Sequence, residues 1–502
     1  MRNDDVFDLL IIGGGINGAG VARDAAGRGL KVALVEAGDL GGATSSASTK
    51  LVHGGLRYLE FYAFGLVRKA LKEREVILRN APHIAAPMPF LLPLEPHLRP
   101  GWMIRAGLFL YDHLAKRREV PGSRAVNLTA DAAGPAFARH LTRAFRYWDG
   151  WVDDARLVLL NARDAAQRGA TILTRIAATD ARHDGRRWTV TLADGRQMQA
   201  TTLLNCGGPW AGDIATRVMQ RADAPALALV QGGHIITRRV NRTADAWMLQ
   251  QPDGRIIFVI PYEGEFSLIG TTETPVDNPA ARTLTEEEEA YLLAAVNRSL
   301  ARPLGPEDIV HRFAGVRPLV KEEGKGARET TRDWKLVHHA DASAMTVIGG
   351  KLTTYRLLAE AVLAALYPGS RPWTADAPLP GGDIARLPGE TARASFDRWL
   401  RDTVARYADY DPKLISRLAR LYGTDCIAML DEGLGENLGG IFTAELAHMR
   451  DREWATTAED ALWRRSKLGL HLSDEAKARV ADWFARHRAE SPVETQSPVE
   501  PA

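Results

Sequence analysis

One segment near the N-terminus gathers side chains that can bind phosphate groups, polyol oxygens and anions. It runs from residue 43 to residue 58 and reads ATSSASTKLVHGGLRY. Its serine and threonine hydroxyls can donate hydrogen bonds to phosphate and polyol oxygens. Arg57 is of the type that binds anions through paired N–H groups, and His53 can accept a proton near neutral pH. The alternative interpretation is a polar loop with a surface arginine and a histidine that bonds to backbone.

Two more cationic side chains stand beside glycines further along the chain. Arg317 lies in the sequence Gly-Val-Arg-Pro, and Lys351 lies in Gly-Gly-Lys-Leu. Glycine allows a ligand or another backbone segment to approach closely, and guanidinium and ammonium groups attract anions. Taken with Arg57, these two residues favour a pocket for an anionic small molecule over the polar-loop interpretation.

A nucleotide-binding pattern precedes the hydroxyl-rich segment. Gly13, Gly15 and Gly18 have the spacing G-x-G-x-x-G, between an apolar strand pattern at 7–12 and a helix pattern at 19–28. The first glycine allows a tight turn, and the second lets a pyrophosphate approach the backbone. The third allows the helix and the strand to pack closely, and the helix N-terminus favours an anion. The pattern therefore predicts a dinucleotide site.

The next strand pattern restricts which dinucleotide can bind. Residues 31–35 are predicted to form this strand, and Glu36 follows at its end. A carboxylate at this point can bind both hydroxyls of an adenosine ribose and would repel a 2′-phosphate. NADP is therefore disfavoured, and the fingerprint by itself leaves FAD and NAD open.

FAD explains why the hydroxyl-rich segment follows the fingerprint. Its ribityl chain and isoalloxazine must run deep into a protein, and small hydroxyl side chains can line that route. Glycine-bearing turns at 205–210 and 349–355 also follow apolar strand patterns. Because the ends of parallel strands meet at one edge of a sheet, all three segments are predicted to converge on one long cofactor. Besides the three glycines and Glu36, the predicted cofactor contacts are Asn17, Thr44, Ser45, Ser48, Lys50, His53, Gly54, Gly55, Gly207, Gly350, Lys351, Leu352 and Thr353.

The composition excludes several other classes of function. A chain of 502 residues is long enough for two or three domains, and its net charge of +2 gives no field that favours nucleic acid. Cys206 and Cys426 are far apart and form no CxxC pair, which argues against a metal site or a disulfide framework and fits a reducing cytoplasm. No secretory signal and no stretch of about 18 apolar residues is seen, so a membrane-spanning helix is not expected.

Strands and helices alternate over most of the chain before a helical C-terminal region. Besides the elements named above, strands are predicted at 171–178, 188–192, 197–204 and 345–348, and a further strand-rich region at about 225–275. Helices are predicted at 59–80, 101–118, 155–168 and 355–366. Proline and glycine at 379–389 indicate a linker. The last twelve residues repeat Ser-Pro-Val-Glu and are predicted to be a disordered tail.

Six segments of the sequence match the pattern of one known family. They read DLLIIGGGINGAGVARDAAGRGLKVALVEAGD, ATSSASTKLVHGGLRYLE, WVDDARLVL, FAGVRPLV, VIGGKLTTYRLLAE and DALWRRSKLGL. These segments resemble the FAD-dependent sn-glycerol-3-phosphate dehydrogenases of aerobic bacteria. The resemblance begins at about residue 6 and extends into the helical C-terminal region, so it covers nearly the whole chain.

The resemblance implies an α/β architecture. A D-amino-acid-oxidase-like FAD-binding Rossmann domain with a β-rich substrate cap would occupy residues 1–378, with the cap mainly at about 76–150 and 215–330. An all-α C-terminal domain would occupy 389–490, and the tail would occupy 491–502. The oligomeric state stays open, with a homodimer among the alternatives.

The resemblance also implies a reaction. The similar proteins oxidise glycerol 3-phosphate to dihydroxyacetone phosphate by hydride transfer from C2 to flavin N5. They pass the electrons to quinone, either ubiquinone or menaquinone, while bound peripherally to the inner face of the cytoplasmic membrane. Oxidising a secondary alcohol in this way requires the protein to orient the substrate and to accept the hydroxyl proton.

Individual residues take roles from the same resemblance. Arg317 matches the substrate arginine of the family and would hold the C2 oxygen as it becomes negative. Arg57, Lys351 and Arg332 are the candidates for the phosphate group, and Tyr58 is expected to contact the substrate beside them. Arg332 could equally form a structural ion pair with the neighbouring aspartate.

Some alternatives remain open at this point. His53 and His234 are both candidates for the proton acceptor, and either could be structural. The segment 101–118 has aromatic residues before a basic end, which suits a membrane surface, but its all-round apolar pattern suits a buried helix equally well. Rival functions are an oxidase that uses O₂, a flavin enzyme of the same fold acting on an amino or hydroxy acid, and a non-catalytic flavin-binding module.

Overall fold

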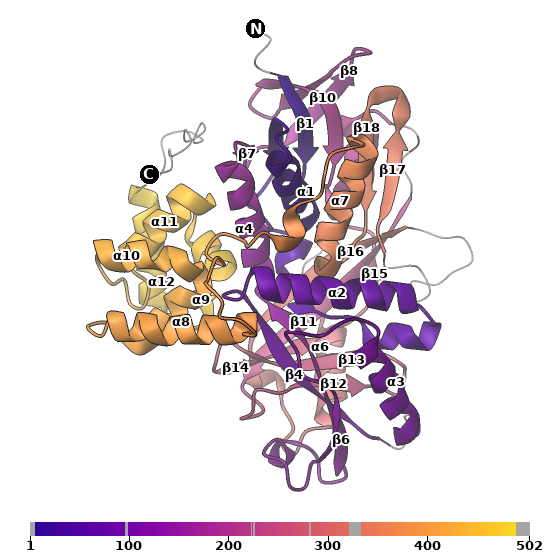
Figure 1. Ribbon diagram of the computed structural model, residues 1–502, viewed down its shortest axis with the longest axis vertical. Helices are drawn as coiled ribbons and strands as arrows, with labels where there is room; N and C mark the ends of the chain where they lie inside the picture. The colour runs from indigo at the N-terminus through magenta and orange to yellow at the C-terminus, as the bar shows by residue number, and fades with distance from the viewer. Residues whose placement is uncertain are drawn as a thin grey trace.

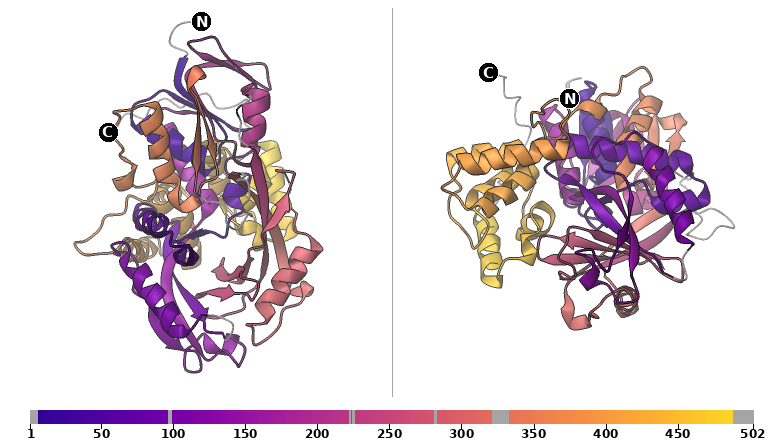
Figure 2. Two further views of the ribbon diagram at one scale, coloured as in Figure 1. Left: turned by 90° about the vertical axis from the view of Figure 1, so that its right-hand side faces the viewer. Right: turned by 60° about the horizontal axis from the view of Figure 1, so that its bottom comes forward.

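The computed structural model describes residues 6–95, 99–221, 223, 226–280, 283–320 and 333–487. Its strands form an eight-stranded and a ten-stranded sheet, and its C-terminal helices gather in a separate group. In Figure 1 the eight-stranded sheet occupies the upper half and the ten-stranded sheet the lower half. The helical group lies to one side, as the right-hand view of Figure 2 also shows.

The eight-stranded sheet contains the nucleotide-binding pattern. Its strands are β1 (Val6–Ile12), β2 (Val32–Val35), β7 (Thr171–Leu173), β8 (Ala178–His183), β9 (Trp188–Leu192), β10 (Gln197–Asn205), β17 (Lys335–His339) and β18 (Ala344–Ile348). The main order is β17-β18-β10-β1-β2-β7, with β9 and β8 following from β10. From β18 to β7 the neighbouring strands are parallel. Their carboxyl ends, and the turns after them, therefore meet at one edge of the sheet.

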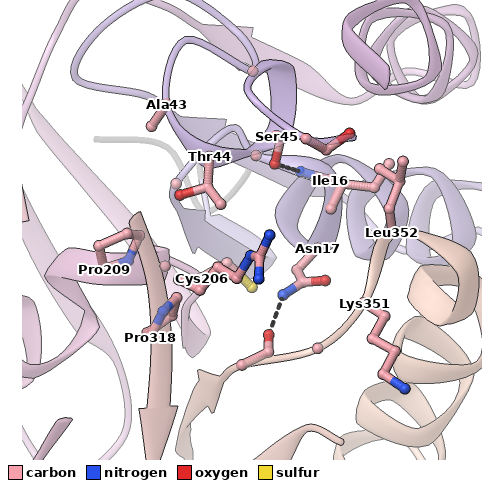
Figure 3. A pocket seen from close by; sticks show the side chains of 18 of the residues that line it. Ile16, Asn17, Ala43, Thr44, Ser45, Cys206, Pro209, Pro318, Lys351 and Leu352 are labelled. Atoms are coloured by element: carbon pink, nitrogen blue, oxygen red, sulfur yellow. Dashed lines mark hydrogen bonds between the residues drawn. The ribbon is translucent and has the colours of Figure 1, made fainter. Parts of the chain in front are cut away.

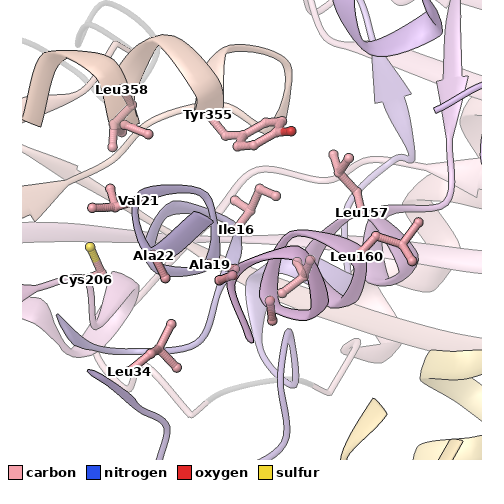
Figure 4. Packing of buried hydrophobic residues seen from close by; sticks show 14 of the residues in the cluster. Ile16, Ala19, Val21, Ala22, Leu34, Leu157, Leu160, Cys206, Tyr355 and Leu358 are labelled. Carbon is pink, nitrogen blue, oxygen red and sulfur yellow. The ribbon is translucent and has the colours of Figure 1, made fainter. Parts of the chain in front are cut away.

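Three helices cover one face of this sheet. They are α1 (Ile16–Gly27), α4 (Asp154–Gln167) and α7 (Tyr355–Leu366). Figure 4 shows Val21 of α1 on the side of Leu358 of α7, and Ala19 of α1 on the side of α4, which carries Leu157 and Leu160. The helices approach closely because α1 is built from small residues, and their apolar faces are buried together.

The ten-stranded sheet is assembled from two separate parts of the chain. Its strands are β3 (Leu51–Val52), β4 (Ala85–Pro93), β5 (Arg124–Asn127), β6 (Arg143–Val152), β11 (Leu227–Arg238), β12 (Ala246–Gln250), β13 (Ile256–Tyr262), β14 (Phe266–Gly270), β15 (Thr274–Val276) and β16 (Ile309–Val320). Alternate side chains face opposite sides. Trp247 packs against α6 (Glu286–Asn297), whereas Met248 faces the core under α2 (Phe64–Asn80) and α3 (Gly101–His113).

The C-terminal helical unit, residues 392–486, has a core of its own. It contains α8 (Ala392–Arg406), α9 (Pro412–Tyr422), α10 (Cys426–Glu432), α11 (Thr443–Glu453), the π-helical segment Asp460–Arg465 and α12 (Asp474–Arg486). Buried ion pairs attach it to the FAD-binding part. Arg156 Nη1 lies 2.6 Å from a carboxylate oxygen of Glu453, and Lys467 Nζ lies 3.0 Å from Asp153.

The structure confirms the fold class and corrects three element predictions. The helix expected at 59–80 begins only at Phe64, because Tyr62 has a φ of 55° and interrupts the chain after a 3-10 turn. The strand expected at 171–178 is divided into β7 and β8 by Arg175, which has a φ of 60°. The helix expected at 101–118 ends at His113. The predicted tail at 491–502 lies outside the described residues.

The lengths and apolar character of the described helices bear on whether the chain crosses a membrane. None of those helices combines the length and the apolar character that crossing a bilayer requires.

Candidate active site

A large cavity opens at the edge where the parallel strands of the eight-stranded sheet end. Its volume is about 1280 Å³, and its wall includes the turn after β1, the hydroxyl-rich segment and the turns after β10 and β18. Side chains of the ten-stranded sheet form the opposite wall, among them Met248 and Phe258. Because pockets for one small ligand are typically about 300–1,000 Å³, this cavity has room for a larger molecule or for two. Figure 3 shows several of its lining residues.

Two of the three fingerprint glycines, Gly13 and Gly18, are required by close backbone contacts. Gly13 has a φ of 111°, and a Cβ atom there would lie 2.5 Å from the carbonyl oxygen of Cys206. A Cβ atom on Gly18 would lie 1.9 Å from the carbonyl oxygen of Gly13. Gly18 therefore packs the helix on the strand without lining the cavity, whereas Gly13 and Gly15 do line it. This arrangement is the one expected for a pyrophosphate beside the start of α1.

Glu36 lies at the end of β2, as the sequence predicted. Its carboxylate accepts hydrogen bonds from the backbone N–H of Gly14 at 2.6 Å and of Gly38 at 2.7 Å. These bonds orient the carboxylate while the side chain lines the cavity. The position suits a carboxylate that binds ribose hydroxyls.

The hydroxyl-rich segment is held by protein contacts along the cavity wall. Ser45 Oγ accepts the backbone N–H of Ile16 at 3.0 Å, at the first turn of α1 (Figure 3). Thr44 Oγ1 donates to the carbonyl oxygen of Val316 in β16 at 2.5 Å. Ser48 Oγ donates to Asp154 at 2.7 Å. These hydroxyls therefore connect α1, β16 and α4, besides lining the cavity as predicted.

Besides Gly18, two more of the predicted cofactor contacts lie away from the cavity wall. Lys50 is buried, and its Nζ lies 2.7 Å from Asp154, so the ammonium group serves an ion pair. A Cβ atom on Gly54 would lie 2.5 Å from a methyl carbon of Leu71, so Gly54 allows close packing. The position of a residue in the sequence alone does not say whether its side chain faces the cavity or the protein core. The other predicted contacts apart from Gly18, which are Asn17, His53, Gly55, Gly207, Gly350, Lys351, Leu352 and Thr353, line the cavity.

The two candidate histidines have different environments. His53 lines the cavity, and its backbone N–H bonds to Thr353 Oγ1 at 3.3 Å. His234 is fully buried in β11, stacked on Phe313 with ring centroids 4.8 Å apart. Burial, with the positive charges of Arg317 and Lys50, lowers the pKa of His234 well below its ordinary value. His234 is therefore neutral and is absent from the cavity wall.

Three predicted cationic residues come together in the cavity wall from three separate segments: a 3-10 turn, strand β16 and the turn after β18. Arg57, Arg317 and Lys351 all line the cavity. Lys351 Nζ lies 3.9 Å from the ring centroid of Tyr58, which also lines the cavity. The guanidinium of Arg317 lies over Gly232, where a Cβ atom would be 3.0 Å from Arg317 Nη2. Arg332, the fourth predicted cation, lies outside the described residues.

Several lining residues were not predicted from the sequence. Thr271, Glu273 and Arg255 line the cavity from the ten-stranded sheet side. Thr271 is placed by Gly232, where a Cβ atom would lie 2.7 Å from its hydroxyl oxygen. The glycine pair before His234 was the available signal for such a close approach. Residues of the C-terminal helical unit also line the cavity, and no local pattern indicated this.

Comparison with known proteins agrees with this geometry. The family model described as FAD dependent oxidoreductase matches residues 8–356. A glycerol-3-phosphate dehydrogenase of Pseudomonas aeruginosa is 45% identical, over 97% of this chain and 97% of that protein. The chain belongs to the FAD-dependent glycerol-3-phosphate dehydrogenase family. It is also 47% identical to a D-erythritol 1-phosphate dehydrogenase of Brucella abortus, over 96% of this chain and 99% of the relative.

A solved structure supports the same assignment. The glycerol-3-phosphate dehydrogenase from Bacillus halodurans, complexed with FAD, superposes with a TM-score of 0.74 at 27% sequence identity. The match covers 96% of this chain and 94% of that one. This protein is therefore an FAD-dependent oxidoreductase, and its predicted cofactor is confirmed.

The residues of the cavity fit FAD. Gly13 and Gly15 leave the backbone open for a pyrophosphate, and Glu36 is placed for an adenosine ribose. Asn17 Nδ2 donates to the carbonyl oxygen of Gly349 at 3.0 Å (Figure 3), whereas its buried Oδ1 has no partner among the described residues. A buried acceptor in a cavity wall is normally satisfied by a donor, which a polar cofactor can supply.

Proposed function

We propose that this enzyme oxidises sn-glycerol 3-phosphate to dihydroxyacetone phosphate. The observation that carries the proposal is the convergence of Arg57, Arg317 and Lys351 on the FAD cavity. One carboxylate would be served by a single arginine, whereas a phosphate dianion together with a developing alkoxide uses several fixed cations. The names of the relatives from Pseudomonas aeruginosa and Escherichia coli support the same substrate.

The residues divide the work of this reaction between binding and proton transfer. Bound FAD supplies the hydride acceptor for the secondary alcohol. We assign Arg57 and Lys351 to the substrate phosphate, since both are cationic and face the cavity. Arg317 holds the C2 oxygen as its proton leaves. His53 is assigned as the proton acceptor, because it lines the cavity and His234 does not.

D-erythritol 1-phosphate is the second candidate substrate. The Brucella abortus relative named for this substrate is 47% identical over nearly the whole chain. The two substrates are both polyol phosphates, so the same cations and the same proton acceptor would serve either. They differ in chain length, so the part of the cavity beyond the reacting carbon would decide between them.

An anaerobic titration tests the substrate. The purified protein would be mixed without oxygen with glycerol 3-phosphate, D-erythritol 1-phosphate, lactate or a D-amino acid, and the visible absorbance of oxidised flavin followed. We expect glycerol 3-phosphate to bleach the flavin fastest. Faster bleaching by D-erythritol 1-phosphate would transfer the assignment to that substrate. Bleaching by neither polyol phosphate, with flavin bound, would contradict the proposal.

We also propose that the electrons pass to a membrane quinone. Exposed apolar side chains gather at the start of α2, on the turn before it and on α3, and we call them the apolar patch. Its members are Phe61, Tyr62, Phe64, Trp102, Met103, Phe109 and Leu110. The cavity reaches this patch, because Phe61 is part of its wall. Contiguous exposed apolar surface of this kind is typical of membrane or partner contacts.

Basic side chains near the patch support contact with an anionic membrane. Arg68, Lys72, Lys116 and Arg117 line a shallow hollow formed by α2 and the chain after α3. Aromatic residues seat at the interface of a bilayer while basic residues attract its lipid headgroups. We therefore propose that the protein binds a membrane peripherally. The cytoplasmic side of the cytoplasmic membrane is proposed from the resemblance to the bacterial glycerol-3-phosphate dehydrogenases.

Sedimentation with vesicles tests the patch. We expect Trp102→Ser combined with Phe109→Ser to reduce binding to vesicles that contain an anionic lipid, because both rings are exposed. Leu387→Ser is the matched control, since Leu387 and Phe109 are both 58% exposed and Leu387 lies outside the patch. Equal binding of all variants would contradict the membrane site.

Turnover measurements test the electron acceptor. Turnover with O₂ as fast as with added quinone would favour the oxidase alternative.

A further inference from the structure

The C-terminal helical unit contributes to the wall of the FAD cavity. Thr457, Glu459, Asp460 and Arg464 line it, in the region that also includes Glu36 and Arg175. Glu36 marks the place of the adenosine ribose, so these residues stand at the adenosine end of the site. They lie about one hundred residues beyond position 356, where the match to the FAD-binding family ends.

Ion pairs attach this wall to the turn that follows Glu36. Asp39 in that turn is buried and is paired with both Arg464 and Arg465. Arg465 Nη2 donates to Asp39 Oδ1 at 2.8 Å. Arg464 also pairs with Asp460 and, at 3.1 Å, with Glu459. One arginine thus connects the adenosine turn of the FAD-binding part to two carboxylates of the helical unit.

A second contact closes the same region from the other side. Arg175, just after β7, lies 2.5 Å from Asp460, and its backbone N–H bonds to the carbonyl oxygen of Gly38. Burial raises the pKa of Asp460, but hydrogen bonding by Thr456 and the positive charges of Arg465 and Arg175 outweigh it. The resulting pKa is well below the ordinary value. Asp460 is therefore ionised at neutral pH and can hold both Arg175 and Arg464.

We propose that the C-terminal helical unit forms the outer wall of the adenosine end of the FAD site. Arg464 is its positioning residue. The wall fixes the turn containing Glu36 and Asp39, and it restricts the route by which FAD leaves. Because FAD binds the docked arrangement, FAD binding and docking of the helical unit stabilise each other.

Removing one member of a buried charge network has a predictable result. Replacing Arg464 leaves Asp39 with Arg465 alone and leaves Glu459 without its cation on this wall. The buried carboxylates of Asp39 and Asp460 would then each keep one arginine instead of two. Less positive charge would offset their burial, so the docked arrangement would be less stable. The turn after β2 should then move more freely, and FAD should leave faster without any change in the residues that face the substrate.

The rate of FAD release tests the proposal, and it needs no substrate. The holoenzyme would be diluted, and the rise in flavin fluorescence on release followed. We expect Arg464→Met to release FAD at least tenfold faster than the unsubstituted protein, with an unchanged circular dichroism spectrum. Added FAD should also raise the Tm of Arg464→Met by less than it raises the Tm of the unsubstituted protein.

Asp425→Asn is the matched control. Asp425 lies 2.8 Å from Arg163 of α4, so it joins the same two parts of the protein outside the cavity wall. We expect this variant to release FAD at the ordinary rate. Equal release rates for Arg464→Met and the unsubstituted protein would overturn the proposal. Equally fast release from Arg464→Met and Asp425→Asn would also overturn the proposal. The cause would then be weaker attachment of the helical unit as a whole and not the loss of Arg464 from the cavity wall.

A second variant keeps the test available if Arg464→Met does not fold. Glu459 is exposed and lines the cavity, so Glu459→Trp places a large ring in the wall without removing a buried group. We expect weaker FAD binding, with the Tm of the FAD-free protein unchanged. Ordinary FAD affinity in this variant would contradict the wall. Because the readout is flavin binding, failure here would leave the proposed substrate unaffected.

Discussion

At the scale of single residues, the candidate chemistry depends on what surrounds each side chain. Arg317 and Gly232 lie on the neighbouring antiparallel strands β16 and β11. The missing side chain of Gly232 leaves the space in which the Arg317 guanidinium and the Thr271 hydroxyl approach each other. His53 and His234 are chemically identical, yet one lines the cavity and the other is fully buried.

Removal of the Arg317 side chain should separate cofactor binding from turnover. We expect Arg317→Ala to retain FAD, because the predicted cofactor contacts are elsewhere. Loss of one donor to a developing oxyanion typically lowers kcat by about 10²–10³-fold. Flavin content and the anaerobic rate of flavin bleaching would be measured together. Turnover near that of the unsubstituted enzyme would exclude Arg317 from the site.

Displacement of the same guanidinium should have a milder effect. A Cβ atom at position 232 would lie 2.7 Å from Thr271 Oγ1 and 3.0 Å from Arg317 Nη2. We expect Gly232→Ala to lower kcat between about 10- and 100-fold through misplacement. Gly212→Ala is the control, because the nearest atom to its Cβ would be 3.7 Å away. If both variants turned over normally, the contact would have no role in catalysis.

At the scale of elements, the hydroxyl-rich segment acts as a connector. Thr44 joins it to β16, Ser45 to α1 and Ser48 to α4. The N-terminus of α1 carries no side-chain cap of its own, so Ser45 supplies an acceptor to one of its N–H groups from a distant turn. The hydroxyl-rich segment thereby links the N-terminus of α1, where an anion is expected to bind, to β16, which carries Arg317.

Loss of the Ser45 hydroxyl should weaken FAD binding. The bond from Ile16 N–H to Ser45 Oγ holds the anion-binding end of α1 in the position that FAD needs, and a bond of this kind contributes about 1 kcal/mol. Loss of that amount from binding corresponds to about a fivefold change in Kd. We expect Ser45→Ala to raise the Kd for FAD by that factor, measured by fluorescence titration of the FAD-free protein. Ser46→Ala is the matched control, since Ser46 Oγ bonds only locally to Ala43 at 3.3 Å. Equal affinities of the two variants would contradict the connecting role.

At the scale of the whole molecule, buried charges join its parts. Arg156 and Arg163 of α4 contact Glu453 and Asp425 of the C-terminal helical unit. His83 is buried beside these two arginines. Its burial and their positive charges lower its pKa to about 3. The folded protein therefore keeps His83 neutral at pH values where the unfolded chain binds a proton.

Acidification should consequently reduce stability through His83. Since the unfolded histidine has a pKa of about 6.5, stability is lost as the pH falls from there toward 3. At pH 5.5 the loss is about 1.4 kcal/mol relative to pH 7.5. We expect denaturant unfolding of His83→Asn to show a smaller change between these pH values. His140→Asn, at an exposed site, should keep the full change; identical behaviour of both variants would contradict this assignment.

The sequence predicted the parts of the site that depend on neighbouring residues. The structure confirms the tight turn at Gly13, the helix after it, the place of Glu36 at the end of β2 and the hairpin of β9 and β10, because turns and strand ends are determined within a few residues. The contacts of these residues with the cofactor stay predictions. It failed where a single left-handed residue, Tyr62 or Arg175, interrupted a regular pattern. The spacing of residues also did not show that the side chains of Lys50 and His234 are buried in the protein and not in the cavity wall.

The sequence by itself thus determined an FAD-binding α/β protein with three cation-bearing segments. It also predicted that Arg57, Arg317 and Lys351 share a pocket, and all three line the cavity. Only the tertiary structure decided that His53 lines it while His234 is buried elsewhere, and that Arg464 closes its far end. The physical reason is the range of the interactions involved. A tight turn needs contacts between adjacent residues, whereas a cavity wall requires two sheets and a helical unit to pack together, with Asp39 and Arg464 paired across more than four hundred residues.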